Sequence, residues 1–319
     1  MRVSINSCAQ ASVFATALFC SLLDAKSYQL PQTKQLIGLP STHIVQQGDY
    51  FLSISEIHNV GFLPLIAANP NVDPLLPQLE TQITLPTQMI LPSTAQVGIV
   101  VNLPELRLYY FEPEKSQVHV YPIGIGQKGH RTPVTRSFIS QKRKSPDWIV
   151  PEPLRKRYLT EKNIVLPPIV PAGPDNPLGS YAMRLGKSEY LIHGTNQRFG
   201  IGLSVSSGCI RMFESDIEEL FNRVELNTPV RIIDQPVKLL LTEQNTVYLE
   251  VHSPLEGSKR QLDIDATLKK LRHILEPAKI DESQLEDIFS QASGIPILLN
   301  TSFKNIELKK TSTRLVFIK

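Results

Sequence analysis

Apolar residues stand together or alternate with polar ones in a series of short runs that begins near residue 97. Each run is broken by proline, glycine or charge, which is the pattern of β-strands joined by turns. The same pattern predicts a mainly β domain. The expected strands span residues 98–102, 106–111, 118–123 and 137–141.

A later part of this domain joins a strand to a helix through a bend of small residues. Residues 190–192 are apolar and end in His193, and residues 206–208 are Ser-Ser-Gly, directly before Cys209. An apolar set at helical spacing then predicts a helix after the cysteine. The set consists of Ile217, Leu220, Phe221 and Val224. We expect the domain to extend over residues 97–234.

The chain before this domain divides into three segments. Residues 1–25 combine a sparse positive start, an apolar stretch and a final small residue, which indicates a secretory signal peptide and export to the periplasm. An uncleaved anchor is the alternative. Residues 26–41 are polar and resemble a linker. Residues 42–92 predict a small α/β module with the order strand, helix, helix, strand.

Two further segments have mixed patterns. Residues 142–179 form a long proline-rich excursion, and such a loop inside a compact domain is usually functional or disordered. It contains Trp148 and a basic cluster at Arg155, Lys156 and Arg157, for which a solvated helix face is the simple explanation. Residues 235–319 predict a small α/β accessory region. Its expected strands are 247–252 and 295–299, and its expected helices are 264–275 and 283–292.

Composition narrows the possible functions. The formal net charge of +3 and the lack of a basic run with interleaved aromatics argue against nucleic acid binding. Cys8 and Cys20 fall in the expected signal peptide, so the mature chain holds only Cys209. Exported proteins meet oxidising surroundings, where cysteines normally pair. An unpaired cysteine there suggests a catalytic thiol.

The surroundings of Cys209 suit nucleophilic chemistry. A cysteine before a helix, behind a bend that exposes backbone N–H groups, can gain a stabilised thiolate and an oxyanion hole. His193, at the tip of the preceding strand, is the candidate base. Taken alone, each residue has a plain structural explanation, since single cysteines and histidines are often buried and inert.

The residues 193–196, His-Gly-Thr-Asn, and 206–211, Ser-Ser-Gly-Cys-Ile-Arg, resemble the signature of the L,D-transpeptidases, the YkuD domain family. That resemblance implies a β-sandwich with a helix after the cysteine. It implies Cys209 as nucleophile, His193 as base, and the carbonyl of Gly194 as the group that orients His193. The backbone N–H groups of Ser207, where many members have histidine, Gly208 and Cys209 would form the oxyanion hole.

The same resemblance implies the substrate. Cys209 would attack the diaminopimelate carbonyl of a peptidoglycan tetrapeptide stem, release D-Ala and pass the acyl group to an amine. Arg211, Asn196 and Trp148 are the candidate substrate-binding residues, and Arg211 either holds a substrate carboxylate or supports the loop. No cofactor is implied, and no cluster of ligands has the spacing of a metal site.

The acceptor and the accessory parts leave alternatives open. Residues 171–179 resemble a segment of the members that anchor the Braun lipoprotein, so the acceptor is expected to be a lysine of an outer-membrane protein, with the diaminopimelate of another stem as the rival. Residues 42–92 resemble a LysM module that binds peptidoglycan glycan, although Tyr50 replaces the usual threonine. An L,D-carboxypeptidase that uses water and a non-catalytic glycan-binding protein are the alternative functions.

Overall fold

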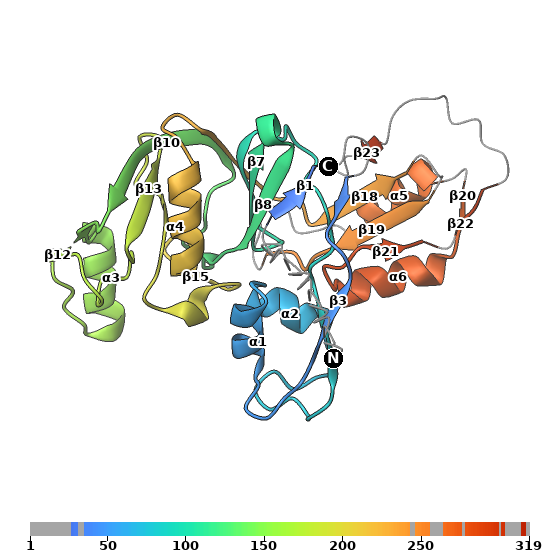
Figure 1. Cartoon of the computed structure of the whole chain (residues 1–319), viewed down its shortest axis with the longest axis horizontal. Helices are drawn as coiled ribbons and strands as arrows, with labels where there is room; N and C mark the ends of the chain where they lie inside the picture. Colours follow the sequence, from blue (N-terminus) through green and yellow to red (C-terminus); the bar gives the residue numbers. More distant parts are fainter. Residues whose placement is uncertain are drawn as a thin grey trace, which may run out of the picture.

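The computed structural model describes residues 27–30, 35–242, 246–255, 264–275, 278–299, 301–303 and 314–316. The expected signal peptide lies outside these residues. Three parts are visible in Figure 1: a helical N-terminal module, a large β domain, and a C-terminal part that packs beside both. Within the described residues, no single helix is long and apolar enough to cross a membrane, although the bent pair of helices in the N-terminal module passes that test jointly.

The β domain is built on a nine-stranded mixed sheet within the described residues, in the order β1-β8-β7-β6-β17-β10-β13-β14-β16. The four strands expected from the alternation are present as β6, β7, β8 and β10. Most neighbours are antiparallel, while β6 pairs with β17 and β14 with β16 in parallel. The bounds are β1 Ser27–Gln29, β6 Gly98–Asn102, β7 Arg107–Glu112, β8 Gln117–Pro122, β10 Thr135–Lys144, β13 Tyr181–Leu185, β14 Leu191–His193, β16 Ile210–Arg211 and β17 Pro229–Ile233.

The expected β-sandwich is instead one curled sheet. The long strand β10 belongs to both halves, because its first residues pair with β17 and its later residues with β13. The register shifts between Ile139 and Gln141, and such a bulge bends a strand and increases its twist. The two halves therefore face each other without separating into two sheets. Helix α4 (Glu214–Arg223) packs Ile217 and Leu220 into the core between them.

The segment expected to be a linker contributes to this sheet. Residues 27–29 form β1, which pairs with β8 at the edge, and the Ser27 hydroxyl lies 2.8 Å from Nδ1 of His119. Farther along, β2 (Leu36–Ile37) pairs with β5 (Met89–Ile90). The linker interpretation was wrong for these residues. Edge pairing depends on a distant partner strand, which a polar three-residue run does not reveal.

The N-terminal module has the expected order of elements. Strand β3 (Ser41–Ile44) pairs with β4 (Gln82–Leu85), and between them lie helices α1 (Phe51–Ile57) and α2 (Phe62–Ala68). Both helices bury apolar residues against the two strands, among them Phe51, Ile54 and Leu65. The module therefore has its own small core.

The excursion after β10 is more regular than its sequence suggested. Strand β11 (Trp148–Ile149) pairs with β12 (Ile169–Val170), and helix α3 (Glu152–Lys162) lies between them. No residue of α3 is buried, so the helix lacks the apolar stripe that would have identified it.

The C-terminal part contains a second sheet, with the order β21-β19-β18-β23 among the described residues. The expected strand at residues 247–252 and both expected helices are present. A cluster that includes Leu249, Leu271 and Phe289 forms its core. The bounds are β18 Val237–Leu241, β19 Val247–Val251, α5 Ile264–Leu275, β20 Ala278–Ile280, α6 Glu282–Gln291, β21 Ile297–Leu298, β22 Thr301–Phe303 and β23 Arg314–Val316.

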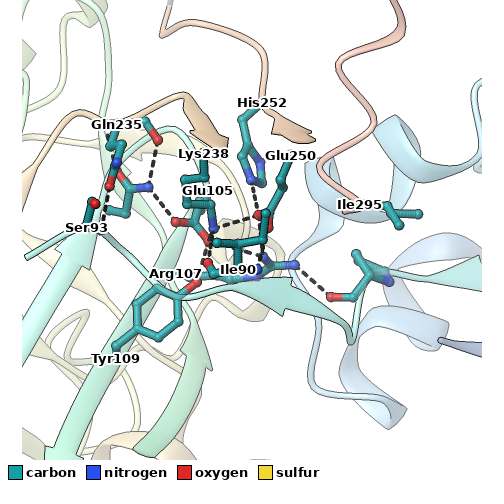
Figure 2. Close-up of polar contacts among 12 residues, drawn as sticks. Ile90, Ser93, Glu105, Arg107, Tyr109, Gln235, Lys238, Glu250, His252 and Ile295 are labelled. Atoms are coloured by element: carbon teal, nitrogen blue, oxygen red, sulfur yellow. Dashed lines mark hydrogen bonds and ion pairs between the residues drawn. The ribbon is translucent and has the colours of Figure 1, made fainter. Parts of the chain in front are cut away.

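Buried charged side chains join all three parts (Figure 2). The Nζ atom of Lys238 lies 3.0 Å from Glu105 and 2.7 Å from Glu250, and all three side chains are fully buried. Arg107 lies 3.2 Å from Glu105 on the other side. Lys238 also donates to the carbonyl oxygen of Ile90 at 2.5 Å, and the Ile90 N–H donates to Glu250 at 2.6 Å. The end of the N-terminal module is thereby fixed to the other two parts.

This cluster is an ion-pair network. Burial would raise the pKa of Glu105, but Lys238, His252 and Arg107 lower it to about 2, so the carboxylate is ionised at neutral pH. Glu105, Glu250 and His252 also bring possible metal-ligand atoms within 4.8 Å of one another. The ammonium group of Lys238 lies between the two carboxylates and supplies the positive charge that a metal ion would bring.

Replacing Lys238 with methionine is expected to lower the free energy of unfolding by about 3–5 kcal/mol, because two buried carboxylates lose their main cation. Denaturant unfolding at neutral pH measures this. Lys115→Met is the matched control: Lys115 pairs with Glu112 at 2.8 Å, but its side chain is 59% exposed. Such a surface pair contributes about 0–1 kcal/mol. Equal losses in the two variants would contradict the assigned role of Lys238.

Candidate active site

His193 and Cys209 lie on neighbouring segments at the edge of the curled sheet. Strand β14 ends in His193 and pairs in parallel with β16, so that His193 lies opposite Arg211 and Ile192 opposite Ile210. Side chains alternate between the two faces of a strand. Ile192 and Ile210 point into the core, so His193 and Arg211 point to the other face, and Cys209 directly precedes β16.

The bend before Cys209 is held by hydrogen bonds from a buried serine. The Ser206 hydroxyl donates to the carbonyl oxygen of Cys209 at 2.6 Å and accepts from the N–H of Gly208 at 3.1 Å. Gly208 has a φ of +109°. A Cβ atom at this position would lie 2.5 Å from a ring carbon of Tyr190, so only glycine fits.

These bonds change the expected oxyanion hole. Ser207, Gly208 and Cys209 all lie in the bend, but the N–H of Gly208 already donates to Ser206. A substrate oxyanion would have to compete for that donor. The N–H groups of Ser207 and Cys209 are therefore the better candidates for stabilising a tetrahedral intermediate.

His193 is buried, with 4% of its surface exposed. Its Nδ1 atom lies 2.6 Å from the carbonyl oxygen of Gly194. Burial and the nearby Arg211 guanidinium lower the pKa of His193 to about 4, against the opposing effect of the Gly194 and Leu178 carbonyls. The imidazole is therefore neutral at physiological pH and able to accept a proton.

Cys209 is a half-buried free thiol. Burial raises its pKa, although a hydrogen bond from the backbone of Leu191 and the charge of Arg211 act in the opposite direction. Thiol and imidazole are both neutral at pH 7 under these conditions. Neutral groups are what proton transfer to a base during attack requires, whereas a preformed ion pair would require a stabilised thiolate.

Arg211 lies close enough to His193 and Cys209 for its charge to act on the pKa of both groups. Its Nε atom is buried and has no hydrogen-bond partner among the described residues. Its backbone forms a bridge with Gly124, which fixes its position on the sheet edge. Burial lowers the pKa of Arg211, while the thiol of Cys209 and the phenol of Tyr158 raise it. A cationic side chain with an unused donor therefore lies near Cys209.

Asn196 and Trp148 occupy different surroundings. The Asn196 amide donates to the carbonyl oxygen of Pro174 at 3.1 Å, which ties residues 171–179 to the loop after His193. Trp148 lies on β11, half-buried, opposite Val170. No contact places Trp148 beside the thiol in the part of the chain that the structure describes.

The basic cluster of α3 does not face only solvent, because one of its arginines contacts the candidate site. A guanidinium nitrogen of Arg157 donates to the Ser207 hydroxyl at 3.1 Å. Helix α3 therefore contacts the bend that precedes Cys209. Sequence reasoning missed this contact because α3 has no apolar stripe and its arginines resemble a solvated face.

Thr132 is a second residue that sequence reasoning did not assign. Its buried hydroxyl donates to the carbonyl oxygen of Gly208 at 3.0 Å and accepts from the N–H of Gly126 at 2.9 Å. Gly126 belongs to β9 (Ile125–Gly126), which pairs with β15 (Ser204–Ser206). Thr132 therefore connects β9 to Gly208, the residue before Cys209. The Thr-Pro pair at residues 132–133 was the available signal.

Comparison with known proteins decides the family. Residues 96–232 match the model of the YkuD domain, described as the L,D-transpeptidase catalytic domain. The chain is 40% identical over 297 residues to the probable L,D-transpeptidase YcfS of Escherichia coli, covering 89% of this chain and 92% of that protein. Over 302 residues it is 37% identical to the probable L,D-transpeptidase YbiS of the same organism, covering 91% and 97%.

The chain belongs to the L,D-transpeptidase family.

Among solved structures, L,D-transpeptidase 3 of Mycobacterium tuberculosis aligns with 15% identity and a TM-score of 0.33, covering 65% of this chain and 97% of that one. The chain is thus an L,D-transpeptidase by its sequence relatives, and the non-catalytic alternative is set aside.

Replacing Thr132 of this L,D-transpeptidase with valine is expected to lower kcat by about ten- to a hundredfold, because small displacements of a catalytic group are costly. Valine keeps the shape but removes both hydrogen bonds of the hydroxyl. Release of D-Ala from a tetrapeptide muropeptide measures the rate. Thr135→Val, at an exposed position on β10, is the control. Equal rates in both variants would remove Thr132 from the site.

Proposed function

We propose that this L,D-transpeptidase acts on the tetrapeptide stems of peptidoglycan, with Cys209 as nucleophile and His193 as base. The observation that supports this most is the pairing of β14, which ends in His193, with β16, which Cys209 directly precedes. A cysteine nucleophile is commonly activated by a neighbouring base such as a neutral imidazole.

The proposed reaction has two halves. The Cys209 sulfur attacks the diaminopimelate carbonyl while His193 accepts the thiol proton; the bond to D-Ala then breaks, and His193 protonates the leaving amine. An acceptor amine next attacks the thioester carbonyl. A new amide bond forms as the carbon–sulfur bond breaks, and the proton lost by the amine passes through His193 to the sulfur of Cys209.

Arg211 is proposed to hold a carboxylate of the donor stem. Its buried and unused Nε atom supports this, since a planar guanidinium can bind a carboxylate through two parallel hydrogen bonds. Arg211→Lys keeps the charge but loses the two-pronged geometry. We expect a higher KM for the tetrapeptide with a smaller change in kcat. A fall in kcat alone would favour the alternative in which Arg211 only supports the loop.

The donor half of the proposal is tested with the mature protein, a tetrapeptide muropeptide and an added amine. D-Ala release together with incorporation of the amine is the expected result, and a carbapenem should add its mass to Cys209. Release of D-Ala without amine in the product would indicate the L,D-carboxypeptidase alternative. The absence of both D-Ala release and the carbapenem adduct would contradict the proposed chemistry.

The acceptor is proposed to be a lysine of an envelope protein. Dedicated contacts beyond the shared Cys/His core are needed to choose one amine over another. The excursion supplies a structured candidate for them. Asn176 is fully buried, and its amide donates to the carbonyl oxygens of Pro146 and Pro171, so the excursion is held in one shape. Asn196 and Arg157 then fix it to both sides of the site.

Sacculi from cells with and without the gene distinguish the two acceptors. After digestion, mass spectrometry is expected to find peptides of an envelope protein bound to diaminopimelate only when the gene is present. Loss of cross-links between third stem residues, with unchanged attached protein, would instead assign the neighbouring stem as the acceptor.

The N-terminal module is proposed to bind peptidoglycan glycan as a LysM-like unit. The order of its elements and the exposed apolar side chains of Tyr50, Leu75 and Leu76 support this. Deleting the module would also remove Ile90 and Pro86, which accept hydrogen bonds from Lys238 and Arg107. Point variants are therefore the cleaner test.

Leu76→Asp, at a side chain that is 82% exposed, is expected to reduce pelleting of the protein with purified sacculi. Ile57→Asp, on α1 at 68% exposure, is the matched control. Equal pelleting of both variants and wild type would argue against glycan binding at the loop that contains Leu76.

We also propose export to the periplasm, which rests on residues 1–25 and on the free thiol of Cys209. N-terminal sequencing of the protein from a periplasmic extract is expected to begin after residue 25. Recovery of the uncleaved chain in the membrane fraction would favour the anchor.

A further inference from the structure

The carboxylate of Glu214 lies against two glycine residues that belong to the surroundings of His193. Glu214 is the first residue of α4, and this helix packs against β13 (Figure 1). A Cβ atom added at Gly179 or at Gly194 would collide with the same carboxylate oxygen, Oε1. Oε1 therefore occupies the space that side chains at these two positions would need.

Both glycines adjoin a carbonyl group that acts on the imidazole of His193. The carbonyl oxygen of Gly194 lies 2.6 Å from Nδ1 of His193. The carbonyl of Leu178, the residue before Gly179, is a second hydrogen-bond acceptor for His193. Burial lowers the pKa of His193, and both carbonyls act in the opposite direction. Glu214 thus packs against the two backbone segments that contact the imidazole.

The second carboxylate oxygen of Glu214 ties these segments to α4. Its Oε2 atom accepts a hydrogen bond from the N–H of Ser180 at 3.0 Å, and Ser180 directly precedes β13. The N–H of Gly194 donates to the carbonyl oxygen of Tyr181, the first residue of β13, at 3.1 Å. Glu214 therefore holds the start of β13 and the residue after β14 against the helix.

Stability alone does not explain why a carboxylate occupies this position. The Oε1 atom is buried and, within the described residues, has no hydrogen-bond partner. A buried carboxylate oxygen without a partner costs free energy. An acidic residue in the first turn of a helix is favoured by the helix dipole, but that effect requires no contact with either glycine. The position of Oε1 therefore points to a role in the site.

The Gly194 carbonyl determines which nitrogen of His193 is free to act as a base. A carbonyl oxygen can only accept a hydrogen bond, so Nδ1 donates and carries the proton of the neutral imidazole. Nε2 then keeps its lone pair and can take the thiol proton of Cys209. If the carbonyl moved away, the proton could reside on Nε2 instead, and that nitrogen could no longer accept one.

We propose that Glu214 is a positioning residue for His193. Its carboxylate keeps the carbonyls of Gly194 and Leu178 against the imidazole, and thereby keeps the proton on Nδ1 and the lone pair on Nε2. Glu214 acts through these carbonyls and takes no proton itself. This inference rests on the proposed function, in which His193 is the base.

Glu214→Ala is expected to lower kcat by about ten- to a hundredfold with little change in KM for a tetrapeptide muropeptide, because small displacements of a catalytic group are costly. Release of D-Ala measures both constants. Glu218→Ala is the matched control, since Glu218 lies on the same helix and accepts a hydrogen bond from the Tyr181 phenol at 2.6 Å. Its kcat should match that of wild type.

Two further variants separate position from charge. Glu214→Gln keeps the length of the side chain and an oxygen that can accept from Ser180, so it is expected to recover most of the lost rate. Glu214→Asp keeps the charge but is one methylene shorter, so it is expected to be as slow as Glu214→Ala. The aspartate variant also replaces the alanine variant if the melting temperature shows that the latter does not fold.

The tautomer of His193 is a readout that does not depend on turnover. Nitrogen NMR spectra of isotope-labelled protein at neutral pH distinguish a protonated ring nitrogen from an unprotonated one, and comparison with His193→Ala assigns the signals. Wild type and Glu218→Ala are expected to carry the proton on Nδ1 alone. Glu214→Ala is expected to show a mixture of both tautomers.

A mixture of tautomers in wild type, an unchanged tautomer in Glu214→Ala, or equal kcat values for Glu214→Ala and Glu218→Ala would overturn the proposal. A raised KM with unchanged kcat would assign Glu214 to substrate binding and would overturn it as well. If Glu214→Gln were as slow as Glu214→Ala, charge rather than position would matter, with the same consequence. Failure of wild type to release D-Ala would instead contradict the proposed function and would leave the tautomer measurement intact.

Discussion

Cys209→Ala is expected to lower the rate of acyl transfer by at least about 10⁴-fold, because removal of a catalytic nucleophile leaves only binding and oxyanion stabilisation. The fold should survive, because the thiol is half-buried and is not one of the groups whose hydrogen bonds hold the bend. The bend is held by Ser206 and Thr132, whose bonds at this point reach backbone atoms. D-Ala release and carbapenem mass addition measure the loss.

The control for this experiment is Ser207→Ala, which leaves the thiol and removes only the hydroxyl that accepts from Arg157. It should retain the carbapenem adduct. The melting temperature of Cys209→Ala and its binding to sacculi should match wild type. Residual transfer within tenfold of wild type would show that another group is the nucleophile.

The sequence predicted the parts of the fold that depend on local patterns. Alternation identified β6, β7, β8 and β10, and helical spacing identified α4 and α5. It missed β1, whose three residues form a strand only because β8 offers an open edge. It also missed α3, where no buried face imposes a period on the residues.

The candidate site, too, could be predicted only where its residues form a local pattern in the sequence. Cys209 and His193 could be named because their neighbours form a long ordered motif. Thr132 and Arg157 reach the catalytic bend from distant segments, and nothing near either residue in the sequence indicates that contact. The buried network around Lys238 is a stronger case. In a sequence, charged residues are normally expected to be exposed. The burial of these residues is favourable only because partners from three parts of the chain meet.

The ionisation state of the Cys/His pair could not be predicted from the motif either. A cysteine beside a histidine often forms an ion pair, and the motif is compatible with that state. The structure buries both groups and places the positive charge of Arg211 near the imidazole, which lowers the pKa of His193 and leaves that of Cys209 raised. The free enzyme is therefore expected to hold a neutral pair.

His193→Ala is expected to lower kcat/KM at neutral pH by about 10²–10⁴-fold, the usual contribution of a general base. In wild type, the rate should fall as pH drops through about 4, where His193 becomes protonated and can no longer accept the thiol proton. Above that pH, the rate should reach a plateau. In the variant, attack depends on the small thiolate fraction, so its rate should rise about tenfold per pH unit until the raised pKa of Cys209 is reached.

Rates of D-Ala release from about pH 3 to about pH 10 give both profiles. His130→Ala, at an exposed histidine of the loop between β9 and β10, tests the rival base and should follow wild type. If His130→Ala showed the tenfold rise and His193→Ala kept the plateau, the base would be His130. Alkylation of wild-type Cys209 by iodoacetamide gives an independent check. A fast, pH-independent reaction between about pH 5 and pH 7 would reveal a preformed thiolate and contradict the neutral pair.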